Sequence, residues 1–407
     1  MTTEILKGIR VADFSRVFAV PACAQILADL GAEVIKIEEP ERGDEARYYG
    51  CNAEELEACG GVSPSFHALN RNKLSVGINL ALEEGREAAR QIVSTCDVVL
   101  HNFRVGTMEK FGLGYEDLRV LQPSLIYGEF SAYGPVGDLA KIGANDLALQ
   151  AHSGLLHLTG EADRPPVRVG TAAIDLHAGM ALSTAIMSAL FHRERTGRGQ
   201  FVETSLLRSS AHLMNYFYSE YWLTGKQRSR MGTANHLSVP NQVFPARDGY
   251  AVIIAPSDQM WDRCAKALNA DRLVRPEFDT IANRQKHRDL LVGLLSDVTQ
   301  QWPVDKLVQV LGDAKVNVAK VNSVGEAADD AQLEAIGGFL TQSEEDGGRK
   351  SVGMPFSMSE VDEIPFRSAP ALGAHTRTVL VASGLPQQDF DRMASQGAFG
   401  SAFQKNS

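Results

Sequence analysis

The chain has no long run of basic residues. Its 407 residues include 40 lysines and arginines against 50 aspartates and glutamates, so the formal net charge is -10. An acidic chain without a basic patch is a poor partner for nucleic acid or for an anionic membrane surface. The longest apolar stretch, residues 178–191, contains three hydroxyl side chains and is too short to cross a bilayer. We therefore expect no nucleic-acid partner and no membrane association.

Cysteine is scarce and follows no pattern. The five cysteines form no Cys-x-x-Cys pair and their number is odd, so the sequence indicates neither a disulfide framework nor a zinc site. The N-terminus shows no basic segment followed by an apolar one, as a secretory signal would. These features predict a cytoplasmic protein that holds no metal.

The sequence also lacks the Gly-x-Gly-x-x-Gly turn that binds dinucleotides. Residues 9–14 and 34–37 are apolar runs typical of strands, and between them Pro21 stands where a first helical turn favours proline. The turn after the first strand contains no glycine, which argues against an NAD site. Strands and helices continue to alternate as far as residue 130, so the fold class predicted is α/β, with a large Rossmann-like, doubly wound domain.

After residue 225 the character of the sequence changes. Residues 226–230 are polar and basic, as in a linker, and a strand and two helices then follow within a shorter unit. We therefore predict a smaller α/β domain at 226–325.

Asp175 is the one residue whose position suggests covalent chemistry. It is the only acid between Asp163 and Glu194, and it stands just before a long apolar helix predicted over 176–195. Backbone N–H groups and the helix dipole at such a position favour an ionised carboxylate, which can attack an activated acyl group. Aspartate is equally a preferred N-cap residue, and position alone favours that structural role.

A second long helix is predicted over 205–223.

A series of short segments resembles the family III CoA-transferases, the CaiB/BaiF family that includes formyl-CoA transferase and carnitine CoA-transferase. The segments are LKGIRV (6–11), ADLGAEVIK (28–36), NRNK (70–73), HNFRVG (101–106), LTGE (158–161), PPVR (165–168), RTGRGQ (195–200) and LGAHT (372–376). Each segment alone is weakly specific, but their order and spacing cover nearly the whole chain. The resemblance implies a large domain of residues 1–225 completed by 326–407, with 226–325 between, in an interlocked homodimer.

The resemblance also implies an activity and a set of site residues. Asp175 matches the nucleophile of the family, which attacks an acyl-CoA and forms first an anhydride and then an aspartyl-CoA thioester. Coenzyme A is then a substrate, and no cofactor is bound covalently at rest. The positions that match coenzyme A contacts are Phe18, Ala19, Ile78, Asn102, Phe103, Arg104 and Lys110. Four of these also have a structural interpretation: Ile78 and Phe103 as core, Arg104 and Lys110 as solvated charges.

The chain departs from the formyl-CoA transferases at several positions. Glu39, Ala81 and Ser131 stand where those enzymes carry basic residues, and residues 232–236 do not match their glycine-rich loop. Formyl-CoA and oxalate are therefore not indicated as substrates. Succinyl-CoA is the donor that the habits of the family suggest. Candidate ligands for the acceptor carboxylate are Arg168, Arg208 and His236.

Two other functions remain open from the sequence. The α-methylacyl-CoA racemases of the same superfamily use a histidine where this chain has Asn145, which cannot exchange a proton at neutral pH. Transfer is therefore favoured over racemisation, which α-proton exchange in deuterated water without an acceptor acid would expose. A non-catalytic, CoA-binding subunit of a heteromeric transferase would be expected to lack Asp175. Activity of the isolated chain distinguishes that alternative.

Overall fold

The computed structural model describes residues 4–343, 348–361, 364 and 366–404, which form two compact units. The larger unit takes its residues from 1–155, 169–222 and 335–407, and the smaller from 156–168 and 223–334. Sequence-based assignment placed 156–168 in the large domain, whereas the contacts group this segment with the smaller unit. The chain returns to the larger unit after residue 334.

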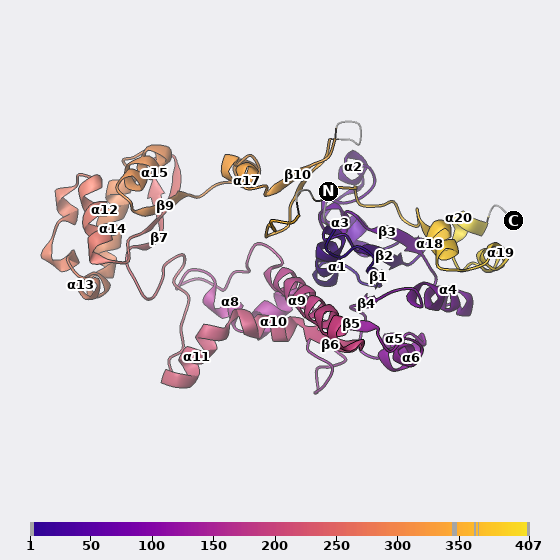
Figure 1. Cartoon of the computed structure of the whole chain (residues 1–407). Helices are drawn as coiled ribbons and strands as arrows, with labels where there is room; N and C mark the ends of the chain where they lie inside the picture. The colour runs from indigo at the N-terminus through magenta and orange to yellow at the C-terminus, as the bar shows by residue number, and fades with distance from the viewer. Residues whose placement is uncertain (1–3, 344–347, 362–363, 365, 405–407) are drawn as a thin grey trace. The chain divides into compact units, whose positions relative to one another are not determined.

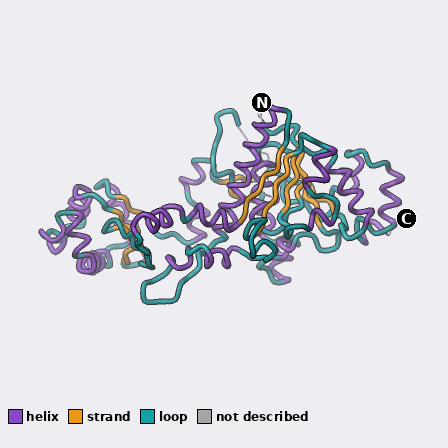
Figure 2. The backbone as a smooth tube through the Cα atoms, turned by 90° about the horizontal axis from the view of Figure 1, so that it is seen from below, coloured by secondary structure: helices purple, strands orange, loops and turns teal. Residues whose placement is uncertain are grey.

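The larger unit is built on a six-stranded parallel sheet (Figures 1 and 2). Its strands are β1 (Arg10–Asp13), β2 (Glu33–Glu38), β3 (Leu74–Gly77), β4 (Val98–His101), β5 (Ile126–Ser131) and β6 (Gln200–Ser205). The spatial order is β3-β2-β1-β4-β5-β6, and every neighbouring pair is parallel. The winding direction reverses between β1 and β4, and sheets of this kind bind ligands beyond the carboxyl ends of the strands at that point.

Helices cover both faces of this sheet. On one face lie α1 (Ala19–Asp29) and α9 (Ala173–Thr196), and on the other lie α4 (Glu83–Val93), α18 (Thr376–Ala382) and α19 (Gln387–Ser395). Because apolar side chains are buried on both faces, the strands read as nearly continuous apolar runs. This is why the sequence indicated β1 and β2 as apolar runs, and the alternation of strands and helices up to residue 130, which takes in β4 and most of β5.

The longest helix, α9, is the central element beside the sheet. It begins at Ala173, three residues before the predicted start, and ends where Gly197 adopts a left-handed conformation. By length and composition α9 could cross a membrane, but it packs closely against α1. At Gly179 a side chain would lie 2.4 Å from the carbonyl oxygen of Ala19, so only glycine allows this approach.

The prediction of one helix over 205–223 was wrong. The chain forms α10 (Leu206–Leu213) and α11 (Asn215–Thr224), which are separated at Met214. Residues 200–205, which follow the turn after α9, form β6 at the edge of the sheet. The start of β6 lies against β5 so closely that a side chain at Gly199 would meet the backbone of Leu125 at 2.0 Å.

Short elements complete the larger unit. They are a 3₁₀ turn η1 (Glu45–Tyr48), α2 (Ala53–Ala58), α3 (Pro64–Asn70), α5 (Thr107–Lys110), α6 (Tyr115–Leu121), α7 (Asp146–His152), β10 (Phe339–Thr341), β11 (Lys350–Val352) and α20 (Ser401–Gln404). β10 and β11 pair as a small antiparallel ribbon.

The smaller unit has an antiparallel sheet of three strands, β7 (Asn241–Ala246), β8 (Gly249–Ile254) and β9 (Asn317–Lys320). Its own apolar core includes Phe244, Trp261 and Leu291. The helical elements of this part of the chain are α8 (Leu155–Leu158), α12 (Asp258–Ala267), η2 (Asp271–Leu273), η3 (Pro276–Phe278), α13 (Ile281–Lys286), α14 (Arg288–Thr299), α15 (Val304–Asp313), α16 (Val324–Ala328) and α17 (Ala331–Ala335).

Candidate active site

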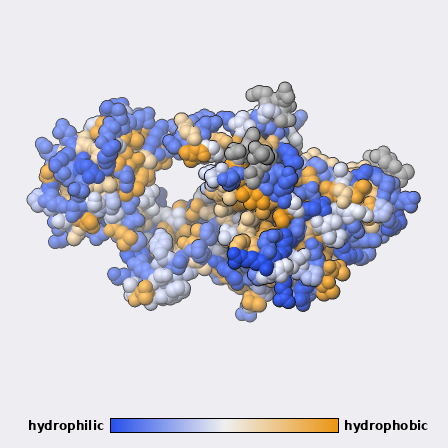
Figure 3. All heavy atoms as spheres, viewed as in Figure 1, coloured by the Kyte–Doolittle hydropathy of each residue, from blue (hydrophilic) through white to orange (hydrophobic). Residues whose placement is uncertain are grey.

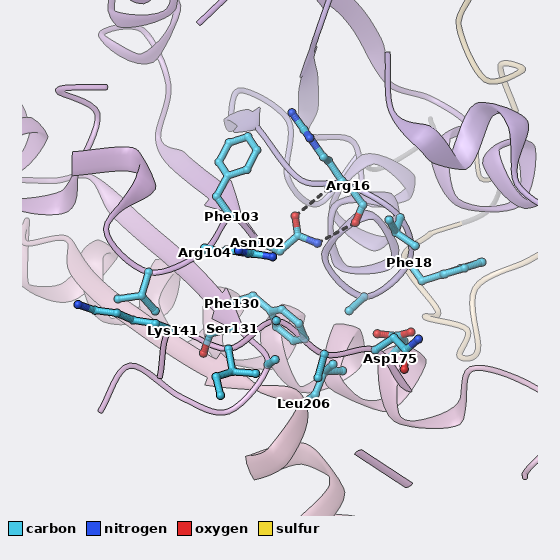
Figure 4. A pocket seen from close by; sticks show the side chains of 18 of the residues that line it. Arg16, Phe18, Asn102, Phe103, Arg104, Phe130, Ser131, Lys141, Asp175 and Leu206 are labelled. Carbon is cyan, nitrogen blue, oxygen red and sulfur yellow. Dashed lines mark hydrogen bonds between the residues drawn. The ribbon is translucent and has the colours of Figure 1, made fainter. Parts of the chain in front are cut away.

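A cavity of about 370 Å³ lies in the larger unit at the carboxyl ends of β1, β4 and β5 (Figure 4). Three stretches that follow or end these strands line it: 16–19, 102–105 and 130–132. The rest of the wall consists of residues 140–145, Asp175 in α9, Leu206 in α10, Glu45 and Tyr49. The cavity therefore sits where the sheet reverses its winding, which is the position expected of a ligand site in this architecture.

The structure brings together most of the residues that the sequence singled out. The cavity is lined by Phe18, Ala19, Asn102, Phe103, Arg104 and Asp175. Ile78 is not in this wall: it lies just after β3, 1% exposed, in the apolar core. Lys110 ends α5 and is exposed at the surface, also outside the wall of the cavity. The wall of the cavity thus contains six of the eight positions, and Ile78 and Lys110 lie outside it.

Sequence reasoning missed several residues of the wall. Arg16 belongs to the same turn as Phe18, and its guanidinium lies 5.0 Å from the centre of the Phe103 ring. Lys141 comes from the loop after β5, and Glu45 and Tyr49 come from the region of η1. A signal existed for Arg16 and Lys141, because loops that follow parallel strands at this edge carry ligand contacts. In Figure 4, Arg104 and Lys141 lie on the side of the cavity away from Asp175.

The turn after β1 is held in a strained conformation. Val17 has a φ of 67°, a left-handed conformation that is costly for a β-branched residue. Its N–H donates to both oxygens of Asp44, at 3.1 and 3.2 Å. The neighbouring Arg16 N–H donates to Asn102 Oδ1 at 2.9 Å, and Asn102 Nδ2 donates back to the Arg16 carbonyl at 2.7 Å. These bonds fix the start of α1 against the cavity.

A network of buried ion pairs stabilises this turn. Lys36 Nζ lies 2.9 Å from Asp44 Oδ2 and donates to the Ser15 carbonyl at 2.8 Å, with both ionic side chains almost fully buried. Lys73 Nζ lies 3.1 Å from Asp13 Oδ2 in the same interior. Burial opposes the charge on Lys36, but Asp44 and other nearby carboxylates outweigh burial and raise its pKa. Burial lowers the pKa of Lys73 to about 8, although Asp13 opposes this shift.

Asp175 lies in the first turn of α9, but it is not the N-cap. The N-cap is Ala172, whose side chain cannot cap the helix, and the Asp175 carboxylate accepts no hydrogen bond from any described residue. Burial and then the neighbouring Asp146 carboxylate raise the pKa of Asp175 to about 7. Burial and the Asp146 charge thus oppose the ionised form that the helix terminus was expected to favour.

Asn145, which replaces the histidine of the racemases, has a structural task. Its side chain caps α7 by accepting the Ala148 N–H at 3.2 Å. His177 is close to Asp175 in sequence but lies beside Ser209 and His212 instead. Among the described residues, no histidine lines the cavity. The wall therefore offers Asp175 no histidine with which to share proton transfer.

Residues 6–376 match the family described as CoA-transferase family III, and the chain belongs to this family. It is an enzyme of the CaiB/BaiF fold that acts on acyl-CoA substrates, as the short sequence segments had indicated.

Named relatives match over most of their length. The succinate–glutarate CoA-transferase of Agrobacterium fabrum is 34% identical, over 92% of this chain and 94% of that protein. The succinyl-CoA:mesaconate CoA-transferase of Haloarcula hispanica is 33% identical, over 93% of this chain and 96% of that protein. The crystal structure of a CAIB/BAIF family protein from Brucella suis superimposes with a TM-score of 0.85 at 33% identity, covering 94% of this chain and 100% of that one.

Proposed function

We propose that this enzyme transfers coenzyme A from succinyl-CoA to a short dicarboxylic acid, with Asp175 as the nucleophile. The observation that carries the proposal is the Asp175 carboxylate, which faces the cavity without a hydrogen-bond partner among the described residues. The names of the two CoA-transferase relatives pair succinate or succinyl-CoA with glutarate or mesaconate, both of which are dicarboxylates. Transfer of coenzyme A from one dicarboxylic acid to another needs no ATP, because the two thioesters have similar free energies of hydrolysis.

The proposed chemistry conserves atoms and electrons at each step. The Asp175 carboxylate attacks the thioester carbon, the C–S bond breaks, and coenzyme A thiolate leaves a mixed anhydride. The thiolate then attacks the aspartyl carbon of that anhydride, which releases succinate and leaves an aspartyl-CoA thioester. The acceptor carboxylate attacks this thioester, and the same two steps in reverse give the new acyl-CoA and restore Asp175.

The walls of the cavity suit this chemistry. The N–H groups of Phe18 and Ala19, at the start of α1, have no protein partner among the described residues, and we assign them to the developing oxyanion. Arg16, Arg104 and Lys141 provide the positive charge that the diphosphate of coenzyme A requires. Phe130 and Leu206 make part of the wall apolar, which limits the access of water to the anhydride.

We infer that the distal acceptor carboxylate is bound by a residue other than the three cations of this wall assigned to coenzyme A. The side of the wall near Asp175 bears Phe18, Phe130 and Leu206 and no cation in Figure 4. Of the candidates from the sequence, Arg208 pairs with Glu203 at 3.1 Å. Arg168 and His236 belong to the smaller unit.

An acceptor screen tests the substrate class. Purified enzyme is incubated with succinyl-CoA and a panel of mono- and dicarboxylic acids, and new acyl-CoA species are identified by mass spectrometry. We expect transfer to short dicarboxylates such as glutarate, and transfer to monocarboxylates at least about tenfold slower, because a lost charge-assisted contact costs about 1.5–3 kcal/mol. Equal rates for both acid classes would contradict the dicarboxylate assignment. The same assay with acetyl-CoA as donor tests the choice of succinyl-CoA.

We also infer a homodimer, because α9 exposes an apolar strip on the larger unit. Met180, Met187 and Phe191 on α9 border an apolar groove together with Phe356 and Met358, and Phe191 is 60% exposed. Figure 3 shows apolar side chains at the surface of this unit. An uncovered strip of this kind is typical of an interface with another chain.

Sedimentation equilibrium tests the dimer against the chain mass of 44.2 kDa. We expect about twice this mass for the wild-type protein and a shift toward the monomer for Phe191→Glu. Val120→Glu is the matched control, because Val120 is 75% exposed on α6 and outside the groove. A monomeric wild-type protein would exclude the homodimer.

A further inference from the structure

The first turn of α9 is capped from another helix. A helix leaves its first N–H groups without partners inside the helix, and Ala172 has no side chain that can accept them. Asp146, the first residue of α7, supplies the acceptor: its Oδ2 receives the Ile174 N–H at 2.8 Å and the Asp175 N–H at 3.2 Å. One carboxylate oxygen therefore holds the backbone of Asp175 itself.

Asp146 is fixed in this position by its own partners. It is 6% exposed, and its second oxygen accepts a hydrogen bond from the side-chain amide of Gln150, one turn further along α7. Gln150 is fully buried, and its own carbonyl oxygen accepts the Val169 N–H at 3.0 Å. The Asp146 carboxylate is thus oriented by α7 and by the chain that leads into α9.

This arrangement reverses the usual effect of a helix N-terminus on a carboxylate. An aspartate in the first turn normally accepts a backbone N–H or benefits from the positive end of the helix dipole, and its anion is stabilised. Here Asp146 takes the N–H groups of Ile174 and Asp175, and its own negative charge lies next to Asp175. These two N–H groups are therefore not free to stabilise the Asp175 carboxylate.

Within the described part of the chain, no nearby cation balances the negative charges of Asp146 and Asp175. The helices and strands packed against α9 carry few titratable groups: Cys23, Asp29, Tyr127, Glu129, Asp146, His152, Glu203, Arg208 and His212. Arg208 is the one permanent cation in this set, and it pairs with Glu203. The remaining charged groups in the wall of the cavity are Arg16, Glu45, Arg104 and Lys141. In Figure 4, Arg104 and Lys141 lie away from Asp175.

We propose that Asp146 is a positioning residue that occupies the N–H groups at the start of α9 and so keeps the Asp175 carboxylate unpaired and strongly nucleophilic. The proposal rests on the proposed role of Asp175 as the nucleophile. Reactivity of an oxygen nucleophile increases with its basicity, and the raised pKa of Asp175, about 7, agrees with this role. The consequence is an acid limb near neutral pH, because protonated Asp175 cannot attack.

The pH dependence of Asp146→Asn tests the proposal. In the wild-type enzyme we expect kcat/KM to rise with pH through about 7. The asparagine retains an acceptor for α9 but not the charge, so the acid limb should move down by about one pH unit or more. The plateau of kcat should fall about tenfold because the less basic carboxylate is a weaker nucleophile, while KM for the acyl-CoA changes little.

Ser257→Ala separates this effect from loss of a helix cap. Ser257 caps α12 in the smaller unit through the Met260 N–H at 3.2 Å, so its loss lowers stability without changing charge near Asp175. The thermal midpoint should fall in this control while the acid limb stays at its wild-type position.

Gln150→Met is a second test of the proposal. It removes the hydrogen bond that Gln150 donates to Asp146 but leaves the Asp146 carboxylate in the chain. We expect the same direction of shift there.

The outcomes also separate this proposal from the role of Asp175. An acid limb at the wild-type pH in Asp146→Asn, or in Gln150→Met if the asparagine variant does not fold, overturns the positioning role. Mass spectrometry of the acyl-enzyme adduct should still show modification at Asp175 in both variants. Absence of the adduct in the wild-type enzyme would instead reject the proposed function itself.

Discussion

Replacement of Asp175 by asparagine should lower the rate of coenzyme A transfer by at least about 10³-fold. The amide has nearly the same size as the carboxylate but cannot attack the thioester or carry the acyl group. Binding should be little changed, because Arg16, Arg104 and Lys141 remain in the wall of the cavity. Loss of activity with retained coenzyme A binding is therefore the expected signature of Asp175→Asn.

The same variant should not be less stable than the wild-type enzyme. The Asp175 carboxylate accepts no hydrogen bond from the described residues, and its pKa is raised from 3.8 to about 7 by burial and by Asp146. Because the folded state prefers the protonated form, the ionised carboxylate destabilises the fold increasingly as pH rises from about 4 to about 7. The stability gained by Asp175→Asn should grow over this interval and stay constant above it.

Transfer assays, hydroxylamine trapping and thermal unfolding at several pH values measure these effects. Asp389→Asn is the matched control, since Asp389 also lies in the first turn of a helix, but its side chain is 44% exposed and pairs with Arg392. It should leave transfer and its pH dependence unchanged. Asp175→Ala is a second variant to be measured, because asparagine can convert slowly to aspartate whereas alanine cannot. Turnover within about tenfold of wild type in the alanine variant would show that Asp175 is not the nucleophile.

Replacement of Lys36 by methionine should destabilise the larger unit by about 3–5 kcal/mol. The change removes the cation that faces Asp44 at 2.9 Å and leaves that carboxylate buried without its partner. It also removes the donor to the Ser15 carbonyl. Since Asp44 holds the strained Val17 by its N–H, the turn that begins α1 should loosen, and the affinity for coenzyme A should fall as well.

Urea unfolding of single and double variants measures this effect. Lys36→Met combined with Asp44→Asn should recover part of the lost stability, because the double change no longer buries an unpaired charge. Lys266→Met is the control: Lys266 pairs with Asp262 at 2.8 Å, but both side chains are more than half exposed. An exposed pair of this kind contributes about 0–1 kcal/mol. A cost for Lys36→Met no larger than for the control would contradict the structural role of the buried network.

Much of the fold was visible in the sequence because it depends on local pattern. Four strands of the parallel sheet show as apolar runs, since the strands are buried on both faces. β3 and β6 were missed. They are recognisable as strands only through their neighbours β2 and β5, with which they pair in parallel register. The assignment of residues 156–168 to the smaller unit likewise depends on contacts between distant segments.

The residues of the candidate site also fall into two groups: those that the local sequence indicates and those that only the fold brings into play. The segment 102–104 could be found because the family motif HNFRVG lies there, and the turn after β1 because Phe18 and Ala19 match coenzyme A contacts of the family. Lys141 and Asp44 lie outside those segments. Lys36 ends the segment 28–36, but nothing in that motif indicates that it contacts the turn after β1.

Asp175 shows most clearly what the sequence determined and what the tertiary structure determined. The sequence by itself determined that an aspartate begins a long apolar helix and matches the nucleophile of its family. It predicted an ionised, helix-stabilised carboxylate, because local reasoning includes only the helix to which Asp175 belongs. The tertiary structure places Asp146, 29 residues earlier, on the N–H of Asp175, and burial adds to its effect. A carboxylate's pKa depends on the charges and solvent around it, and only the folded chain brings Asp146 and the buried wall to that position.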